Sequence, residues 1–385
     1  MHHLIAFSHL RWNFVWQRPQ HLLSRLARRW PVIFIEEPVP SSDRAHLEQT
    51  APCPGVQVWR PHVTGSAPGF SDEHLPQLQP MITRAVAEAQ VRDAWHWFYT
   101  PMALPLSSGL PGRGIVYDCM DELSAFRFAP RQLVQRENAL LKVADLVFTG
   151  GLSLYHAKRG RHLNLHCFPS SVDARHFARA AQDHPLQQRL ARPRLGWSGV
   201  IDERVDLDLL AALADARPDW QFVMVGPIVK IDPGSVPRRA NIHWLGQRAY
   251  DELPEFISGW DVCLLPFAIN EATRFISPTK TLEYMACGRP SVSTPIRDVV
   301  EPYQHLVSIA ATPDDFLLAC ESILARTDPE RACHAQAMAE AVSRTSWDDT
   351  AHQMARLMEQ IEVEQPSPDL EHVYPSQGYP IQAHR

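Results

Sequence analysis

The chain has 385 residues, 45% of them hydrophobic, which is enough for two domains of ordinary size. Its formal net charge is −6, whereas proteins that bind nucleic-acid phosphates are usually basic, so we expect no nucleic-acid partner. The seven cysteines include no C-x-x-C pair, no apolar run is as long as a membrane span, and the N-terminus does not resemble a signal peptide; we therefore expect a reduced, cytoplasmic chain.

The first half of the chain alternates apolar strands with amphipathic helices. Strands are predicted at 4–9, 32–38, 56–61, 96–101, 114–122 and 145–151, and helices at 18–30, 73–91, 130–143 and 152–159. This alternation is typical of a Rossmann-like domain with a parallel sheet, which we place at residues 1–180. No G-x-G-x-x-G motif opens the first helix, so a nicotinamide cofactor is disfavoured.

The loop after the first strand carries side chains that suit a carbohydrate. They are Trp12, Asn13, Trp16, Gln17 and Arg18. Indole and amide groups stack on sugars and hydrogen-bond to them, and an open α/β sheet binds its ligands at the carboxyl ends of its strands. These residues are therefore candidates for binding an acceptor; the alternative is that they only pack the loop.

The first predicted helix, 18–30, has a basic face made of Arg18, Arg25, Arg28 and Arg29. A solvated face is the ordinary explanation of this pattern. Arginines beside leucines and an aromatic residue also suit a peripheral membrane surface, which would help an enzyme whose acceptor is linked to a lipid. Contact with the inner face of the plasma membrane is therefore a hypothesis.

Three carboxylates, Asp118, Asp121 and Glu122, lie at the end of what should be a central strand. A carboxylate held there by apolar neighbours could act as general base on an acceptor hydroxyl, with Asp121 as the base and Asp118 orienting it. The alternative is a helix N-cap cluster, because Asp121 and Glu122 precede the sequence LSAF.

The second half repeats the alternation after a polar stretch at 175–190. Strands are predicted at 194–202, 221–227, 241–247, 261–267 and 290–296. We place the second Rossmann-like domain at 190–345. A final amphipathic helix is expected at 346–361, and the polar segment 362–385 is expected to be a loosely ordered tail.

A short helix between the last two strands has both of its ends marked in the sequence. Ser277 can cap it, Pro278 suits its first position and Gly288 suits its exit. Because a strand runs into this segment and another leaves it, the helix should sit at the carboxyl ends of parallel strands, where such sheets bind ligands.

Polar side chains at the start of this helix indicate a diphosphate site. A helix N-terminus presents unpaired N–H groups and partial positive charge, to which Lys280 adds a full charge on the polar side. Thr279 and Glu283 lie one turn apart on the shoulder of the apolar face, where Glu283 suits a pair of sugar hydroxyls. The alternative is an exposed ion pair between Lys280 and Glu283, worth only about 0.2–0.5 kcal/mol.

The string SPTKTLEYMACGRPSVST, residues 277–294, resembles the signature of the group 1, or family 4-like, glycosyltransferases. The resemblance implies a GT-B fold, in which two Rossmann-like doubly wound domains face each other across a cleft and the closing helix crosses back to the first domain. It also implies that Glu283 accepts the ribose hydroxyls of a nucleotide sugar and that the turn from Ser277 to Lys280 holds its diphosphate. The family's earlier glutamate falls on Phe275 here, so that residue's sugar contact is not carried over.

The same resemblance implies further donor-site residues. They are Arg204, Arg274, Gly226, Gly246 and Gln247. The two arginines would help Lys280 to neutralise the diphosphate, because the arginine–lysine pair usual after the first strand of this domain is incomplete. The two glycines would let the backbone approach the base, and the glutamine could meet a pyrimidine edge; simple strand-end turns are the alternative for the glycines.

We therefore interpret the chain as a glycosyltransferase of hexosyltransferase type that moves a sugar from a nucleotide diphosphate, by our prediction uridine diphosphate (UDP), to a glycan or lipid-linked acceptor in the synthesis of a cell-surface polysaccharide. Because a helix dipole, a lysine and backbone amides stabilise the leaving diphosphate in this architecture, neither a metal ion nor a cofactor is expected. Two alternatives remain: a GT-B epimerase of nucleotide sugars, and a non-catalytic sugar- or lipid-binding scaffold of the same fold.

Overall fold

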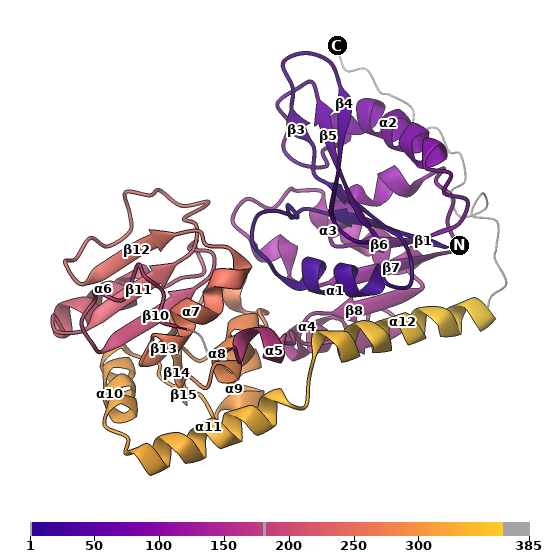
Figure 1. Cartoon of the computed structure of the whole chain (residues 1–385). Coiled ribbons are helices and arrows are strands. Elements are labelled where there is room, and N and C mark those ends of the chain that lie inside the picture. Colours follow the sequence, from indigo (N-terminus) through magenta and orange to yellow (C-terminus); the bar gives the residue numbers. More distant parts are fainter. Residues whose placement is uncertain (1, 180–181, 365–385) are drawn as a thin grey trace.

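The computed structural model of the chain describes residues 2–179 and 182–364. Two α/β domains lie side by side, each built on a sheet of its own (Figure 1). The first domain, coloured from indigo to magenta, contains β1 to β9, and the second, coloured from magenta to orange, contains β10 to β15. The α/β class predicted from the sequence is confirmed.

The first sheet has the spatial order β3-β5-β2-β1-β6-β7-β8-β9, with β4 paired only to β5. Its strands are β1 (His3–Ser8), β2 (Val32–Glu36), β3 (Val39–Pro40), β4 (His46–Cys53), β5 (Val56–Val63), β6 (Ala94–Phe98), β7 (Gly114–Cys119), β8 (Leu146–Thr149) and β9 (Leu165–Cys167). All pairs are parallel except β4 with β5. The sequence did not predict β4, because its mostly exposed residues, HLEQTAPC, show no apolar alternation.

Helices cover both faces of this sheet, because successive strand residues point to opposite sides. They are α1 (Arg18–Leu26), α2 (Leu75–Glu88), α3 (Leu133–Val143) and α4 (Leu152–Lys158), with 3-10 turns η1 (Asp72–His74), η2 (Pro101–Ser107) and η3 (Leu123–Ala125). In β1, Ile5 and Phe7 pack with α2, α3 and α4, whereas Leu4 and Ala6 pack with α1. The buried strands therefore read as continuous apolar runs.

The second sheet is parallel throughout and has the order β12-β11-β10-β13-β14-β15. Its strands are β10 (Arg194–Ser198), β11 (Gln221–Val225), β12 (Ile242–Gly246), β13 (Val262–Leu265), β14 (Ser291–Ser293) and β15 (Ser308–Ile309). Its helical segments are α6 (Leu207–Ala216), η4 (Tyr250–Glu252), α7 (Leu253–Ser258), η5 (Glu271–Thr273), α8 (Thr279–Ala286), α9 (Arg297–Tyr303), α10 (Pro313–Leu324) and α11 (Asp328–Val342). Because the strand order reverses between β10 and β13, a crevice is expected at their carboxyl ends.

The chain passes between the domains twice. α5 (Ala174–Phe177) lies on the way from β9 to β10, and α12 (Trp347–Glu364) returns to pack along α1 (Figure 1). Trp347, Met354 and Met358 of α12 are buried in the core that α1 shares with the first sheet. α12 takes in the first residues of the segment 362–385 that was expected to be a tail, and the rest of that segment lies outside the described residues.

Ion pairs involve Arg25 of α1 and also Arg28 and Arg29, which lie just after that helix. Arg25 and Arg28 each donate to Asp348 of α12 at 3.0 Å, and Arg29 pairs with Glu359 of the same helix. These ion pairs offset part of the positive charge on which the membrane hypothesis depended, and membrane contact stays a prediction. Within residues 2–179 and 182–364, no helix is long and apolar enough to cross a bilayer.

Candidate active site in the interdomain cleft

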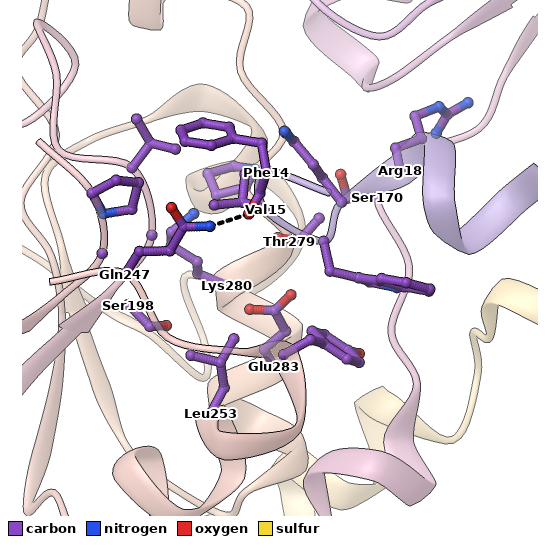
Figure 2. Close-up of a pocket in the computed structure, with 18 of the residues that line it drawn as sticks. Phe14, Val15, Arg18, Ser170, Ser198, Gln247, Leu253, Thr279, Lys280 and Glu283 are labelled. Carbon is purple, nitrogen blue, oxygen red and sulfur yellow. Dashed lines mark hydrogen bonds between the residues drawn. The ribbon is translucent and has the colours of Figure 1, made fainter. Parts of the chain in front are cut away.

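A cleft of about 630 Å³ lies between the carboxyl ends of the two sheets and is lined by both domains (Figure 2). The predicted site residues that line it are Trp12, Asn13, Trp16, Gln17, Arg18, Asp121, Arg204, Gly226, Gln247, Ser277, Thr279, Lys280 and Glu283. Three predicted residues, Asp118, Gly246 and Arg274, are not among its lining residues. The fold therefore brings together groups that lie up to 271 positions apart in the sequence, from Trp12 to Glu283.

α8 forms where it was predicted, but its first turn is built differently. Pro278 is the N-cap, in extended conformation, and no side chain caps the helix. The predicted cap, Ser277, is wrong: its hydroxyl accepts from the backbone N–H of Ser170 at 3.4 Å, and its carbonyl accepts from the Ser170 hydroxyl at 2.6 Å. Ser277 therefore ties the start of α8 to the segment that leaves the first domain. The predicted exit is confirmed, because Gly288 has a φ of 65°.

Lys280 extends into the cleft instead of lying on a solvated polar side. Its ammonium lies 5.0 Å from the centre of the Trp197 ring, a cation–π contact. The side chain also passes over Gly199, where a Cβ would lie only 2.1 Å from the Lys280 Cε, so this path requires glycine. Burial lowers the pKa of Lys280, while the carboxylate of Glu283 opposes this effect. The site therefore holds a cation that has lost much of its hydration.

Glu283 lies one turn along α8 and is only 7% exposed. Burial raises its pKa, against the effects of Lys280 and of a hydrogen bond with Thr279. Among the described residues it makes no ion pair within 4.0 Å, so the alternative of an exposed Lys280–Glu283 pair is wrong. Tyr250 also lines this part of the cleft, and its buried hydroxyl has no hydrogen-bond partner among the described residues. Such groups need a polar ligand to complete their hydrogen bonding.

Arg18 and Asp118 form a buried ion pair beneath the first domain's side of the cleft. The Nε of Arg18 donates to both Asp118 oxygens at 3.1 and 3.0 Å, and its Nη2 donates to one of them at 2.8 Å. Arg18 also donates to the carbonyl of Phe168 at 2.8 Å. The roles predicted for these two residues are therefore corrected: Asp118 holds Arg18 instead of orienting Asp121, and the Arg18 guanidinium is occupied within the protein.

Asp121 is half-buried at the end of β7 and faces the cleft. Burial raises its pKa to about 6, although Arg204 and Arg18 act in the opposite direction. The helix-cap alternative is wrong, because η3 begins after Glu122 without a side-chain cap, and Glu122 instead pairs with Lys158 at 2.6 Å. A carboxylate with such a pKa is ionised near neutral pH and can still accept a proton.

The two predicted diphosphate arginines differ in position. Arg204 lines the cleft, but its guanidinium is held by Asp202 through contacts of 2.7 to 3.1 Å. Arg274 lies outside the cleft: its side chain is 63% exposed and pairs with Glu271 at 3.5 Å. That prediction is corrected, because η5 and the turn after it direct the residue away from α8. Phe275, the position of the family's missing glutamate, packs against the core of the first domain.

The predicted residues in the strand-end turns of the second domain also differ in position, because only some of them line the cleft. Gly226 lines the cleft with a φ of 150°, and a Cβ there would lie 1.8 Å from the carbonyl oxygen of Gly199. Gly246 has a φ of 73° with open space around it, so it serves a turn and its predicted place in the base pocket is corrected. The side-chain amide of Gln247 reaches across the cleft and donates to the carbonyl of Phe14 (Figure 2).

The loop after β1 is partly packed and partly open to the cleft. Trp12 is 6% exposed and meets the Phe34 ring edge-on at 5.2 Å, so packing is its main role. Trp16 is 37% exposed and stacks on Tyr250 of the second domain at 5.6 Å. Asn13 is exposed, and Gln17 is the N-cap of α1. Asn13 and Trp16 therefore remain the better placed candidates for contact with an acceptor.

Sequence reasoning missed several lining residues. They include Ser170, Trp197, Ser198, Gly199 and Tyr250. The signal for three of them was present, since Trp197, Ser198 and Gly199 stand at the carboxyl end of β10, the position that singled out the loop after β1. Tyr250 could not have been found in this way, because its importance comes from a contact with the other domain. Within the described residues, no group of three or more His, Cys, Asp or Glu side chains is placed to hold a metal ion.

Comparison with known proteins gives a consistent result. Residues 192–326 match the family model of group 1 glycosyl transferases. A Bacillus subtilis (strain 168) protein, whose name proposes it as the teichuronic acid biosynthesis glycosyltransferase TuaH, is 25% identical over 286 residues, which are 68% of this chain and 70% of that protein.

Two solved structures share the fold of nearly the whole chain. Sucrose-phosphate synthase from Thermosynechococcus elongatus has a TM-score of 0.72 at 16% identity and covers 95% of this chain and 100% of its own. Anabaena HepE, in complex with UDP and glucose, has a TM-score of 0.66 at 15% identity and covers 94% of this chain and 100% of its own. The chain has the GT-B fold, and its second domain, residues 192–326, resembles the group 1 glycosyl transferases.

Proposed function

We propose that the chain is a glycosyltransferase of the group 1 type, which takes its sugar from a UDP-sugar and transfers it to a glycan or lipid-linked acceptor in the synthesis of a cell-surface polysaccharide. The observation that carries the proposal is the pair formed by Lys280 and Glu283, which are one turn apart, extend into the cleft and are not ion-paired with any described residue. A half-buried cation next to a buried acid suits a ligand that carries both phosphates and hydroxyl groups.

On the donor side, Lys280 and the N-terminus of α8 would meet the diphosphate, and Glu283 would accept hydrogen bonds from the ribose hydroxyls. Thr279 and Ser277 border the same turn, and Gly226 leaves room for the base. Negative charge on the diphosphate grows as the glycosidic bond breaks, so a fixed cation stabilises the transition state more than the ground state.

On the acceptor side, Asp121 would take the proton from the attacking hydroxyl, as an inverting reaction requires. Its position across the cleft from α8 supports this role, as does a pKa raised by burial to about 6. If the configuration is retained, the departing phosphate oxygen takes the proton and Asp121 orients the acceptor. Asn13 and Trp16 border the space that an acceptor sugar would occupy.

The polymer class in the proposal follows the name of the Bacillus subtilis relative, and UDP follows the ligand of Anabaena HepE. All seven cysteines are free, which supports work in a reducing compartment. We do not extend the proposal to membrane contact, because Arg25, Arg28 and Arg29 are paired with α12.

The deciding experiment combines nucleotide binding with product analysis. Titration calorimetry should show UDP binding, and a screen of nucleotide sugars should identify the donor as the one that raises the unfolding temperature most; a ligand at a hundred times its Kd stabilises by about 2.7 kcal/mol. The identified donor is then incubated with and without candidate glycan acceptors. Transfer that needs the acceptor supports the proposal, whereas a changed sugar nucleotide without any acceptor would indicate an epimerase. A folded protein that does not bind UDP would indicate a scaffold.

Metal independence is part of the proposal and is tested in the same assay. Lys280 supplies the positive charge that a divalent cation supplies in other glycosyltransferases, so transfer should be unchanged in excess EDTA. A loss of transfer in EDTA, with recovery on adding Mg²⁺ or Mn²⁺, would refute this part alone.

A further inference from the structure

The segment 122–128, which follows Asp121 in the first domain, contacts the second domain. The backbone N–H of Arg127 donates to the Glu203 carboxylate at 3.2 Å. The ring of Phe126 meets two cations of the second domain, because the Arg204 guanidinium lies 5.6 Å and the Lys230 ammonium 5.8 Å from its centre. Both distances fall within the range of cation–π contacts.

The backbone conformation of Lys230 indicates that the surrounding structure fixes the position of this residue, and with it the contact with Phe126. Its φ is 61°, in the left-handed region that residues other than glycine rarely adopt, and it lies in the loop after β11. Conformations of this kind cost free energy and persist where the surrounding structure requires them, often near functional sites. Among the described residues, Lys230 has no acidic partner within 4.0 Å, and its ammonium contacts the Phe126 ring.

The cations that contact Phe126 also act on Asp121, five residues earlier in the chain. Burial raises the pKa of Asp121; the charges of Arg204, Arg18 and Lys230 oppose this rise, and that of Asp202 adds to it. Arg18 belongs to the first domain and is fixed by its own ion pair. Arg204 and Lys230 belong to the second domain, so the cationic surroundings of Asp121 depend on how the domains are placed relative to each other.

We propose that Phe126 is a positioning residue, whose ring holds Arg204 and Lys230 of the second domain against the segment that carries Asp121. The inference rests on the proposed function for the role of Asp121 in transfer, but the contact itself does not. It links the donor domain to the acceptor-side carboxylate: the two cations that the ring holds oppose the rise in the pKa of Asp121 that burial causes.

The test reads the ionisation of Asp121 directly. The full-length protein is labelled with 13C at the aspartate side-chain carboxyls and titrated by NMR with saturating UDP, and the Asp121 signal is assigned by its loss in Asp121→Asn. Phe126→Leu keeps an apolar side chain but removes the π face. It should raise the apparent pKa of Asp121 by about 0.5–1 unit, the shift expected from weakening two contacts of the cation–π type.

Three further variants make the result specific. Phe126→Tyr keeps the π face and should restore the wild-type titration. Phe128→Leu is the matched control, because Phe128 lies in the same segment, is 73% exposed and meets only the neighbouring Arg127 among the cations described. Lys230→Met removes one cation from the other side of the contact and should shift the pKa in the same direction as Phe126→Leu, so the test survives if Phe126→Leu fails to fold.

An unchanged Asp121 titration in both Phe126→Leu and Lys230→Met would overturn the inference, as would a tyrosine variant that behaves like leucine. The proposed function fails separately, when the transfer assay shows near-normal activity for Asp121→Asn. In that case the titration still decides whether the contact holds the two cations, and only its link to catalysis is lost.

Discussion

The two sides of the cleft differ in how many of their charged side chains are ion-paired within the protein. On the donor side, Lys280 and Glu283 extend into the cleft without an ion pair to any described residue. On the acceptor side, Arg18 is held by Asp118 with contacts of 2.8 to 3.1 Å, and Glu122 is held by Lys158. The donor side therefore leaves Lys280 and Glu283 for a ligand, although its Arg204 is held by Asp202, whereas the acceptor side pairs most of its charges within the protein.

This difference has a physical reason. A desolvated charge is costly unless it is paired, so buried groups without a protein partner are stable only where solvent or a ligand can reach them. A diphosphate and two ribose hydroxyls would complete the donor side. On the acceptor side, Asp121 faces the cleft, and by our proposal its carboxylate takes part in transfer. Substitutions on the two sides should consequently separate donor affinity from transfer.

The largest effect is expected for Lys280→Ala. Turnover should fall by about a hundredfold to a thousandfold, the scale for removing one preorganised charge-stabilising group, because diphosphate charge grows in the transition state. Affinity for the donor sugar should fall much less. Steady-state kinetics with the donor identified by the screen, combined with calorimetry, measure both quantities. Arg274→Ala is the control, because Arg274 lies outside the cleft, and should leave both nearly unchanged. An equal loss of affinity and of kcat/KM, with turnover untouched, would mean that Lys280 only binds.

Asp121→Asn should reduce transfer by roughly a hundredfold while leaving UDP affinity unchanged, because the nucleotide is held by the other domain. A base works only when ionised, so wild-type transfer should fall as the pH drops below about 6, the value to which burial raises the pKa of Asp121. The residual activity of the variant should lose this acidic limb. Loss of UDP binding in the folded variant would contradict the division of the cleft into two sides.

The same substitution should make the protein more stable at neutral pH. The pKa of Asp121 is raised from 3.8 to about 6 by folding, so the folded state binds the proton more tightly and stability falls as the pH rises through this interval. Replacing the charge by a neutral amide should remove a penalty of at most about 3 kcal/mol, and less because water reaches part of the side chain. The gain in unfolding temperature should vanish below about pH 4; a variant less stable than wild type at pH 7 would argue against a desolvated carboxylate.

Glu283→Ala should weaken UDP binding by about 1.5–3 kcal/mol, the range for hydrogen bonds to a charged group. The protein should still fold, because α8 is held by apolar contacts that do not involve this side chain. Calorimetry with UDP measures the loss, and Glu271→Ala, an exposed acid outside the cleft, serves as the control. Unchanged affinity in Glu283→Ala would remove the residue from the nucleotide site.

The same contrast explains how much the sequence could predict. The donor side depends on one short segment, 277–288, whose helix boundaries and charge spacing are local properties, so its residues could be placed before the fold was known. The ion pair of Arg18 with Asp118 joins residues 100 positions apart, and the contact of Gln247 with Phe14 joins residues 233 apart. Tertiary packing decides such pairs, and no local pattern encodes them.

For the helices and strands too, local sequence patterns could be predicted and the effects of tertiary contacts could not. Buried parallel strands were visible as apolar runs because both of their faces are covered. β4 could not be predicted from the sequence. It is an exposed strand at the margin of the sheet, so its residues do not alternate between apolar and polar. The cap predicted at Ser277 failed for a related reason: its hydroxyl serves Ser170 on the segment between the domains, a competitor that the local sequence does not show.

The smallest effect is expected where the two domains meet away from the cleft. Asp298, at the start of α9, is 6% exposed and accepts from the backbone N–H of Ser153 at 3.0 Å, so a side chain of the second domain caps α4 of the first. It fits there because position 151 is glycine, where a Cβ would lie 2.1 Å from its Oδ2. Asp298→Ala should lower stability by about 1–2 kcal/mol, the usual cost of losing a cap, whereas Asp298→Asn keeps an acceptor oxygen and should lose less. Calorimetric unfolding measures the difference. UDP affinity should be unchanged in both variants, since Asp298 does not line the cleft; a coupled loss of UDP binding would show that the donor side depends on the domain contact as much as the acceptor side does.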